Sequence, residues 1–202
     1  KFSNYMQKQV IVIHGGDSFD SYDKFIDSLK NWEVSLKSFL PRHDWKMNMQ
    51  KDLGEDFQVL TPRMPNKQNA RYEEWKIWFE RMFPFIEDGA ILIGHSLGGI
   101  FLAKYLSENT FPKKIASLMF VAAPHNETPE IGDFVLEKPV SEIAKQCGNI
   151  HVFQSKDDPV VMSSEADKYK KDLPGAKMHI FEDRGHFNQE EFPEIIEEIN
   201  NA

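Results

Sequence analysis

The sequence predicts an α/β fold, a three-layer α/β/α sandwich built on a parallel sheet. Short apolar runs rich in β-branched residues alternate with longer segments of helical periodicity along the chain. A Gly-x-Ser-x-Gly turn, Gly94 to Gly98, joins one of these runs to a helix. The sequence contains no repeat, low-complexity tract or linker, and 202 residues are enough for a sizeable core. We therefore expect residues 1–202 to form a single domain.

Six segments fit buried parallel strands, because each is short, apolar and followed by turn residues. They are residues 8–14, 57–60, 90–93, 115–122, 150–153 and 178–181. The segments between them fit helices. We expect one long helix over 22–40, bent or interrupted near Asn31, and further helices over 44–53, 72–82, from 100 onward, and over 141–146, 164–173 and 192–199.

Composition excludes several classes of function. The formal net charge of −8 leaves no basic stripe for a nucleic acid or an anionic membrane surface. No apolar run approaches the roughly 20 residues of a membrane span, and residues 1–6 do not resemble a signal peptide. Cys147 is the one cysteine, so an internal disulfide framework is impossible. These features predict a cytoplasmic protein.

The turn around Ser96 has the context of a nucleophile elbow, a strand followed by a sharp turn and a helix. Such a turn strains the serine backbone and directs Oγ away from the sheet. The start of the helix offers free backbone N–H groups to a developing oxyanion. A five-residue match alone is weak, because an incidental serine in a Gly-rich turn would also satisfy it.

Reactive or small residues follow four of the predicted strands: Gly15 and Gly16, Ser96, Asp157 and Asp158, and His186. The carboxyl ends of parallel strands meet at one edge of a sheet, where sites of α/β proteins collect. The order Ser, Asp, His along the chain is that of α/β-hydrolases. In this arrangement the imidazole takes the serine proton and the carboxylate fixes the imidazole tautomer.

The other histidines and the cysteine are interpreted as structural. His43 and His125 lie in predicted loops without a matched carboxylate, His151 and His179 lie in strands, and His14 and His95 border the two turns. No spacing resembles a zinc site, so we expect no metal. Cys147 has no evident base beside it, which indicates an inert thiol.

Five pieces of the sequence resemble the YdeN and retinoblastoma-binding protein 9-like family of small serine hydrolases. They are residues 12–16, 62–66, 94–99, 155–159 and 185–187. The resemblance implies six parallel strands in the order 2-1-3-4-5-6, a reduced α/β-hydrolase fold without a cap domain. It also implies hydrolysis of small esters, and of amides in some members, without a cofactor.

On this basis we expect Ser96 to attack, His186 to act as base and then acid, and Asp158 to orient the imidazole. Asp158 precedes Pro159, which restricts it to extended geometry, and the family's aspartate also directly precedes this proline. The N–H groups of Leu97 and Gly16 would form the oxyanion hole. The rival hypotheses are a peptidase or thioesterase using the same triad, and a protein-interaction module on a hydrolase fold. The sequence leaves the oligomeric state open.

Two segments carry further expectations. Residues 31–56 form a longer connection than the compact family pattern has, with room for an extra helix. Their apolar positions Trp45, Met49 and Leu53 suggest packing on the domain, and we expect this insertion to border the active site only from outside. Residues 123–148 are too few for an independent cap, which favours small, soluble esters over long-chain lipids.

Overall fold

The sheet has six strands in the order β2-β1-β3-β4-β5-β6. A computed structural model describes residues 7–202; the segment 1–6, in which we expected no signal peptide, lies outside the described residues. Every neighbouring pair of strands is parallel. The strands are β1 Lys8–Ile13, β2 Phe57–Leu60, β3 Ala90–His95, β4 Ile115–Val121, β5 Cys147–Ser155 and β6 Lys177–Phe181. The predicted fold class and strand order are confirmed.

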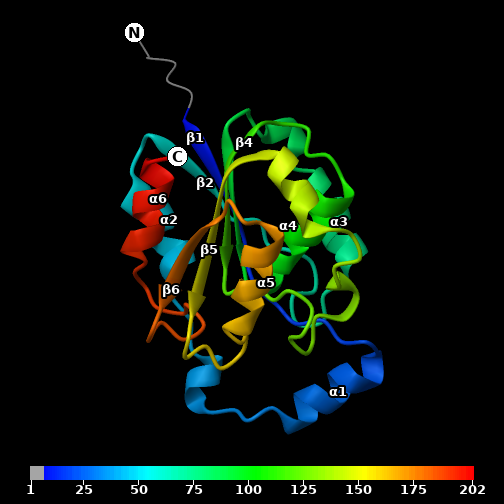
Figure 1. Cartoon of the computed structure of the whole chain (residues 1–202). Helices are drawn as coiled ribbons and strands as arrows, with labels where there is room; N and C mark the ends of the chain where they lie inside the picture. Colours follow the sequence, from blue (N-terminus) through cyan, green and yellow to red (C-terminus); the bar gives the residue numbers. More distant parts are fainter. Residues whose placement is uncertain (1–6) are drawn as a thin grey trace.

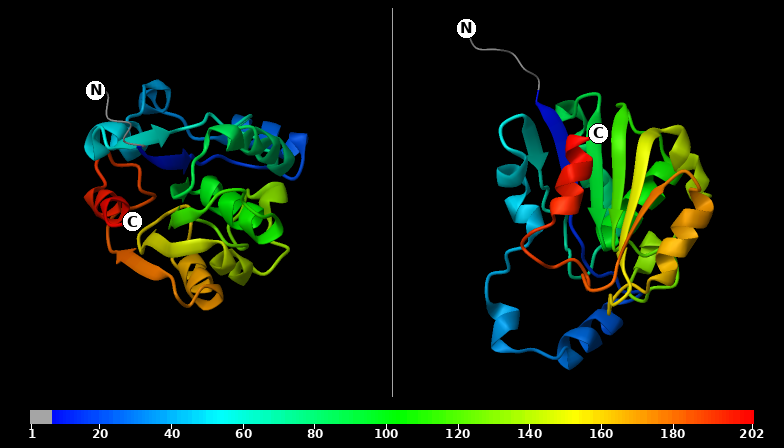
Figure 2. Two further views of the ribbon diagram at one scale, coloured as in Figure 1. Left: turned by 90° about the horizontal axis from the view of Figure 1, so that it is seen from above. Right: turned by 60° about the vertical axis from the view of Figure 1, so that its left-hand side comes forward.

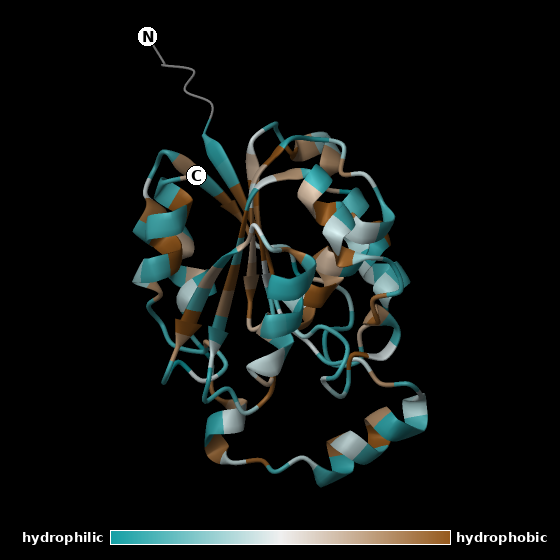
Figure 3. Cartoon of the chain, in the orientation of Figure 1, coloured by the Kyte–Doolittle hydropathy of each residue, from teal (hydrophilic) through white to brown (hydrophobic). Residues whose placement is uncertain are grey.

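Helices cover both faces of this sheet (Figure 1). Helices α3 Tyr72–Glu80, α4 Leu97–Glu108 and α5 Ser164–Asp172 lie on one face, and α2 Trp45–Leu53 and α6 Pro193–Asn200 lie on the other. Figure 2 shows the same three layers from above and from the side. Each face has its own hydrophobic cluster, because a parallel strand exposes alternate side chains to opposite layers. Hydrophobic residues, drawn brown, are frequent in the central strands, and hydrophilic residues, drawn teal, are frequent on the helices that cover them (Figure 3).

The connection from β1 to β2 leaves the body of the domain. Helix α1 Tyr22–Asn31 and the 3₁₀ turn η1 Leu36–Phe39 lie beyond the carboxyl ends of the strands (Figures 1 and 2). The interruption expected near Asn31 is present, because α1 ends there and the backbone is extended at Trp32. Beyond it the predicted helix to residue 40 is replaced by the 3₁₀ turn η1. No residue of α1 or η1 is buried, so tertiary packing does not support a longer helix. The chain returns at α2, whose Trp45, Met49 and Leu53 are buried as expected.

Three shorter 3₁₀ segments complete the fold: η2 Phe83–Phe85, η3 Gly132–Phe134 and η4 Val140–Lys145. Between β4 and β5 the chain therefore holds η3 and η4 and no cap domain, although a regular helix was expected over 141–146. Strand β5 begins at Cys147 and is longer than predicted. Across residues 7–202, no helix has both the length and the apolar character that crossing a membrane requires.

Candidate active site

Ser96 occupies the sharp turn between β3 and α4. Its backbone is in a positive-φ conformation, with φ 54° and ψ −124°. Such a geometry costs a non-glycine residue on the order of 1–3 kcal/mol and persists only where the surroundings impose it. The N–H of Ser96 donates to the carbonyl of Val121 (2.9 Å), which holds the turn against the end of β4. The strained turn predicted for an elbow is therefore present.

Gly98 is required by a close approach of backbones. A Cβ on this residue would lie 2.3 Å from the carbonyl oxygen of Ile13 in β1. Only glycine permits the first turn of α4 to cross the neighbouring strand at this distance. The crossing places Ser96 at the carboxyl end of the sheet, beside the loop that follows β1.

Three side chains from distant parts of the chain meet at this edge. The Oγ of Ser96 lies 2.9 Å from Nε2 of His186. The other ring nitrogen, Nδ1, lies 2.9 Å and 3.1 Å from the two carboxylate oxygens of Asp158. The Asp158 side chain has no solvent exposure, and that of His186 is 12% exposed. A carboxylate on one nitrogen leaves the other free to accept the serine proton.

The two adjacent aspartates have different partners. Asp158 also accepts N–H groups of Val160 (2.8 Å) and Val161 (3.0 Å) through Oδ1. Asp157 instead accepts the hydroxyl of Ser155 (2.6 Å) and the N–H of Gly185 (2.8 Å). These hydrogen bonds hold the pKa of Asp157 below its usual range. Asp157 thus ties the loop after β6 to the end of β5 and does not contact the imidazole.

The loop that carries His186 reverses direction around it. Gly185 and Phe187, on either side, both have positive φ, 53° and 52°. The buried Phe187 anchors the loop, and its carbonyl accepts the indole N–H of Trp45 (2.9 Å). Trp45 opens α2, inside the insertion that we expected to border the site only from outside. Trp45 supports the residue next to His186 and does not line the pocket beside Ser96.

The loop after β1 lies against the elbow on its other side. A Cβ on Gly16 would lie 2.3 Å from the carbonyl oxygen of Lys67, so this position accepts only glycine. His14 holds the loop, because its Nδ1 lies 2.7 Å from the Gly15 carbonyl and its Nε2 accepts the N–H of Met64 (2.9 Å). Nδ1 must therefore carry the proton. Burial lowers the pKa of His14, which favours this neutral form.

The residues expected to form an oxyanion hole share one cavity with the serine. Gly16, Ser96 and Leu97 all line a pocket of about 270 Å³. Leu97 is the first residue of α4, so its N–H has no partner within the helix. Both backbone segments therefore border the same cavity as the serine hydroxyl.

A family model described as serine hydrolase matches residues 37–200. The chain belongs to the serine hydrolase family. Serine hydrolase RBBP9 of Rattus norvegicus is 30% identical over 164 residues, which are 76% of this chain and 83% of that protein. Methylesterase 7 of Arabidopsis thaliana is 32% identical over 74 residues, 37% of this chain and 28% of that protein. The family resemblance predicted from the five sequence pieces is confirmed.

Solved structures show the same fold. The ydeN gene product of B. subtilis has a TM-score of 0.76 at 19% identity, over 96% of this chain and 98% of that one. A meta-cleavage product hydrolase from Pseudomonas fluorescens has a TM-score of 0.66 at 14% identity, over 96% of this chain and 91% of that one. At these identities the likeness concerns the fold of this serine hydrolase and not its substrate.

A second cavity adjoins the pocket at Gly16 and Asp17, which line both. Its volume is about 660 Å³, and its outer wall comes from the last part of α1 and from the segment between α1 and α2. That wall is largely apolar; its hydrophobic members are Leu29, Trp32, Val34, Phe39 and Leu40, all exposed. This part of the insertion thus borders the adjoining cavity, whereas no residue of 31–56 lines the pocket that contains Ser96.

His95, at the variable position of the elbow, has neighbours that the sequence did not indicate. It is buried, its Nε2 lies 2.9 Å from the carbonyl of His186, and its Nδ1 lies 3.4 Å from the ammonium of Lys46. Burial, then the nearby Lys46, lower the pKa of His95 well below its usual value. A neutral His95 with its proton on Nε2 donates to the His186 carbonyl and so fixes the backbone beneath the imidazole.

The remaining histidines and the cysteine differ partly from expectation. His125 does have a matched carboxylate, because its Nε2 lies 2.9 Å from Asp172; the sequence missed this pair because 47 residues separate its members. Burial raises the pKa of the Cys147 thiol to about 12, in agreement with an inert thiol. His151 and His179 lie in β5 and β6 as predicted.

Proposed function

We propose that this serine hydrolase cleaves small carboxylic esters through a Ser–His–Asp triad and an acyl-enzyme. The observation that carries the proposal is the imidazole of His186, which lies 2.9 Å from the Ser96 hydroxyl and 2.9 Å from the buried Asp158 carboxylate. A serine hydroxyl is a weak nucleophile until a neighbouring base takes its proton. In this geometry only Nε2 faces the hydroxyl, so it is the base.

In the acylation step, Ser96 Oγ forms a bond to the ester carbonyl carbon while its proton moves to His186 Nε2. The carbonyl oxygen becomes an oxyanion, stabilised by the N–H groups of Leu97 and Gly16. Collapse of the tetrahedral intermediate breaks the bond to the alcohol oxygen. That oxygen takes the proton from Nε2 and leaves as the alcohol. Asp158 stabilises the imidazolium while it exists.

Water completes the cycle by the same route. His186 Nε2 accepts a water proton as the water oxygen attacks the acyl carbon. The second tetrahedral intermediate collapses with loss of Ser96 Oγ, which recovers the proton. The products are the carboxylic acid and the regenerated enzyme, and no cofactor or metal takes part in these steps.

The walls of the site support a small substrate. The pocket of about 270 Å³ beside Ser96 is walled by loop residues from 124–131 and by the apolar side chains of Pro159, Val160 and Val161. A pocket of this volume accommodates an acyl group of few carbons. The larger apolar-walled cavity beyond Gly16 would receive the alcohol portion, for which it offers more room.

A fluorophosphonate probe tests the proposal directly, because it labels only an activated serine. We expect one equivalent of label on Ser96, abolished by Ser96→Ala and retained by Ser164→Ala, an exposed serine on α5. A folded chain that is not labelled would favour the protein-interaction module instead.

The cytoplasmic location that the sequence predicts needs a test of its own. Fractionation of the cells that produce the protein would provide it.

A panel of matched substrates distinguishes the classes of acyl transfer. We expect p-nitrophenyl acetate and butyrate to be hydrolysed with higher kcat/KM than a thioester or an anilide with the same acyl group. A higher value for the thioester or the anilide would identify a thioesterase or a peptidase that uses the same triad. Ser96→Ala supplies the background rate in each case.

A further inference from the structure

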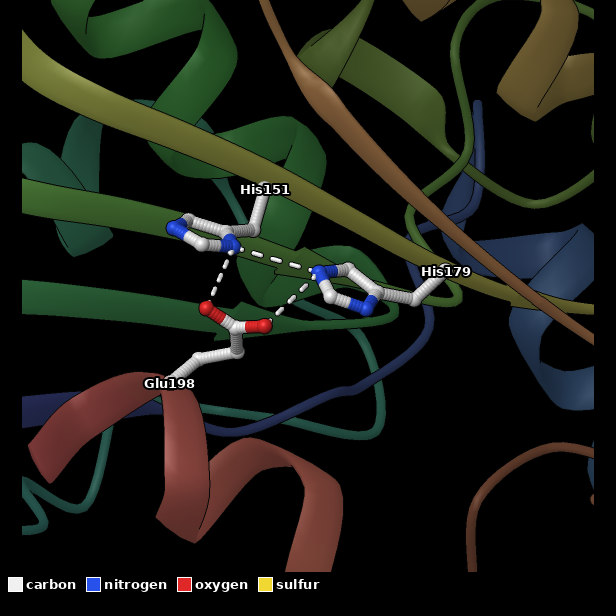
Figure 4. Close-up of side chains that lie close together, drawn as sticks. All are labelled: His151, His179 and Glu198. Carbon is white, nitrogen blue, oxygen red and sulfur yellow. Dashed lines mark hydrogen bonds and ion pairs between the residues drawn. The ribbon is translucent and has the colours of Figure 1, made fainter. Parts of the chain in front are cut away.

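Three potential metal ligands meet on the face of the sheet that α6 covers. His151 lies in β5, His179 in β6 and Glu198 in α6, and Figure 4 shows their ring nitrogens and carboxylate converging between these elements. Their ligand atoms all lie within 4.8 Å of one another. None of the three lines the pocket beside Ser96. The cluster is thus separate from the proposed triad.

Hydrogen bonding alone does not satisfy this cluster. Nδ1 of His151 and Nε2 of His179 lie 3.2 Å apart, so one donates its proton to the other. Oε2 of Glu198 lies 3.6 Å from the first nitrogen and Oε1 lies 3.8 Å from the second, both beyond hydrogen-bond distance. One nitrogen therefore donates to the other, Oε1 of Glu198 contacts the ammonium of Lys177, and Oε2 of Glu198 faces His151 without a hydrogen bond from either ring.

Two of the separations in the cluster are close to those around a tetrahedral cation. Zinc bonds of about 2.0–2.1 Å to nitrogen place neighbouring ligands about 3.3 Å apart. The two ring nitrogens lie 3.2 Å apart, and Nδ1 of His151 lies 3.6 Å from Oε2 of Glu198. The distance of 3.8 Å joins Nε2 of His179 to the other carboxylate oxygen, Oε1, and with one atom taken from each residue all three lie within 4.8 Å. Two imidazoles and one carboxylate are also a known ligand set of zinc, with a fourth position left for water. Hard cations such as Mg²⁺ prefer oxygen ligands alone.

The ligands are held in place and partly accessible. The ring of His179 stacks on the buried Phe153, with centroids 4.2 Å apart and planes 5° from parallel. The side chains of His151, His179 and Glu198 are 9%, 14% and 13% exposed, so an ion can reach them from solvent. Figure 4 shows the second nitrogen of each ring pointing away from the cluster, free to carry the proton displaced by a metal.

One neighbouring cation works against metal binding. The ammonium of Lys177 contacts Glu198 Oε1, which leaves Oε2 as the oxygen facing His151. The Lys177 side chain is 61% exposed, so water screens its repulsion of a bound ion. Removing this ammonium should strengthen metal binding, whereas removing the carboxylate charge should weaken it.

We propose that His151, His179 and Glu198 bind one Zn²⁺ ion, or a similar borderline divalent transition-metal ion, which links α6 to β5 and β6. This site goes beyond the proposed hydrolysis and takes no part in it. Its members are separated by 28 and 19 residues along the chain, so no local spacing signals it.

Calorimetric titration of the chelator-treated protein with Zn²⁺ tests the site. We expect one equivalent to bind, with at least tenfold weaker binding in Glu198→Gln, a variant that keeps the shape of the side chain. Lys177→Gln should bind more tightly. His43→Gln, which removes an exposed imidazole, and His125→Gln, which removes a histidine paired with one carboxylate, should bind as the parent does.

Three results would overturn the proposal. These are the absence of Zn²⁺ binding by the parent, unchanged affinity in Glu198→Gln, and loss of binding only in His186→Gln, which would assign the ion to the triad. Thermal unfolding of each variant in chelator confirms that it is folded before titration. If Glu198→Gln fails to fold, Co²⁺ binding to the parent gives a second readout. The Co²⁺-loaded parent should show the visible absorption of a tetrahedral site, and Mg²⁺ should not displace the Co²⁺.

Discussion

Replacing Asp158 with asparagine tests the proposed triad, because the structure determines which way the new amide must face. Asp158 Oδ1 accepts the N–H groups of Val160 and Val161 at 2.8 and 3.0 Å. In Asp158→Asn the amide oxygen must keep that position, since an NH₂ group there would face two donors. The NH₂ group then faces His186 Nδ1, where Oδ2 now lies at 2.9 Å.

This orientation forces the wrong tautomer on the imidazole. An NH₂ donor requires Nδ1 to accept, so the proton moves to Nε2, the nitrogen 2.9 Å from Ser96 Oγ. Nε2 then cannot take the serine proton. The matching substitution in serine proteases lowers kcat by about 10⁴, and we expect a loss of up to roughly that size here. A factor of 10⁴ corresponds to about 5.5 kcal/mol in the activation free energy.

Asp157→Asn is the matched control, since it removes a neighbouring charge without touching the imidazole. Its amide oxygen can still accept from Ser155 and Gly185, so kcat should stay within about tenfold, or 1.4 kcal/mol. The assay is p-nitrophenyl acetate hydrolysis by both purified variants, after thermal unfolding has shown that each is folded. A kcat for Asp158→Asn within tenfold of the parent, or a reversed order of the two variants, would refute the assignment.

Four further predictions concern the loops, the ionisable groups and the cavity walls. Gly16→Ala places a Cβ against the Lys67 carbonyl. It should lower kcat about 10²-fold, because it displaces one of the two proposed oxyanion donors. The control is Gly175→Ala, whose Cβ meets open space and should leave kcat unchanged. Burial lowers the pKa of His14 and His95 below the value of 6.5 that they have in the unfolded chain. The free energy of unfolding should therefore be highest above about pH 6.5 and fall as the pH drops through the lowered pKa values. Urea unfolding at pH 5–8 measures this, and a maximum of the free energy of unfolding near pH 5 would contradict it. Leu40→Ser should raise KM for esters of bulky apolar alcohols about three- to tenfold and leave KM for methyl esters unchanged, as kinetics with both series will show. Because η3 and η4 form no cap, hydrolysis should show no rate jump when a triglyceride forms an emulsion, and strong interfacial activation in a monolayer assay would be inconsistent with an open site.

The sheet and the elbow could be predicted because their signals are local. A buried strand needs only a short apolar run, and the turn at Ser96 needs glycines at fixed positions beside it. Parallel strands place their carboxyl ends at one edge, so the order of Ser96, Asp158 and His186 along the chain was enough to predict that they meet. Pro159 restricts Asp158 locally, which is why the choice between two adjacent aspartates also followed from sequence.

The connection between β1 and β2 shows the limit of such local signals. Its apolar periodicity suggested a helix to residue 40 with an interruption near Asn31, and the interruption is present. The part beyond it forms only the 3₁₀ turn η1, because a helix extends only where packing supports it and no residue of α1 or η1 is buried. The same periodicity predicted α2 correctly, because Trp45, Met49 and Leu53 do find a surface. Periodicity marks an apolar face without showing whether the fold provides a partner for it.

Contacts between residues far apart in sequence were decided by the tertiary structure alone. The indole of Trp45 donates to a carbonyl 142 residues away, beside His186. His125 pairs with Asp172, and His151 and His179 meet Glu198 where α6 crosses β5 and β6. Each depends on the exact register of strands and the rotation of a helix about its axis, which no spacing rule encodes. The sequence therefore determined the fold and the three residues of the proposed triad, while the supporting hydrogen bonds and the proposed metal site arise from packing.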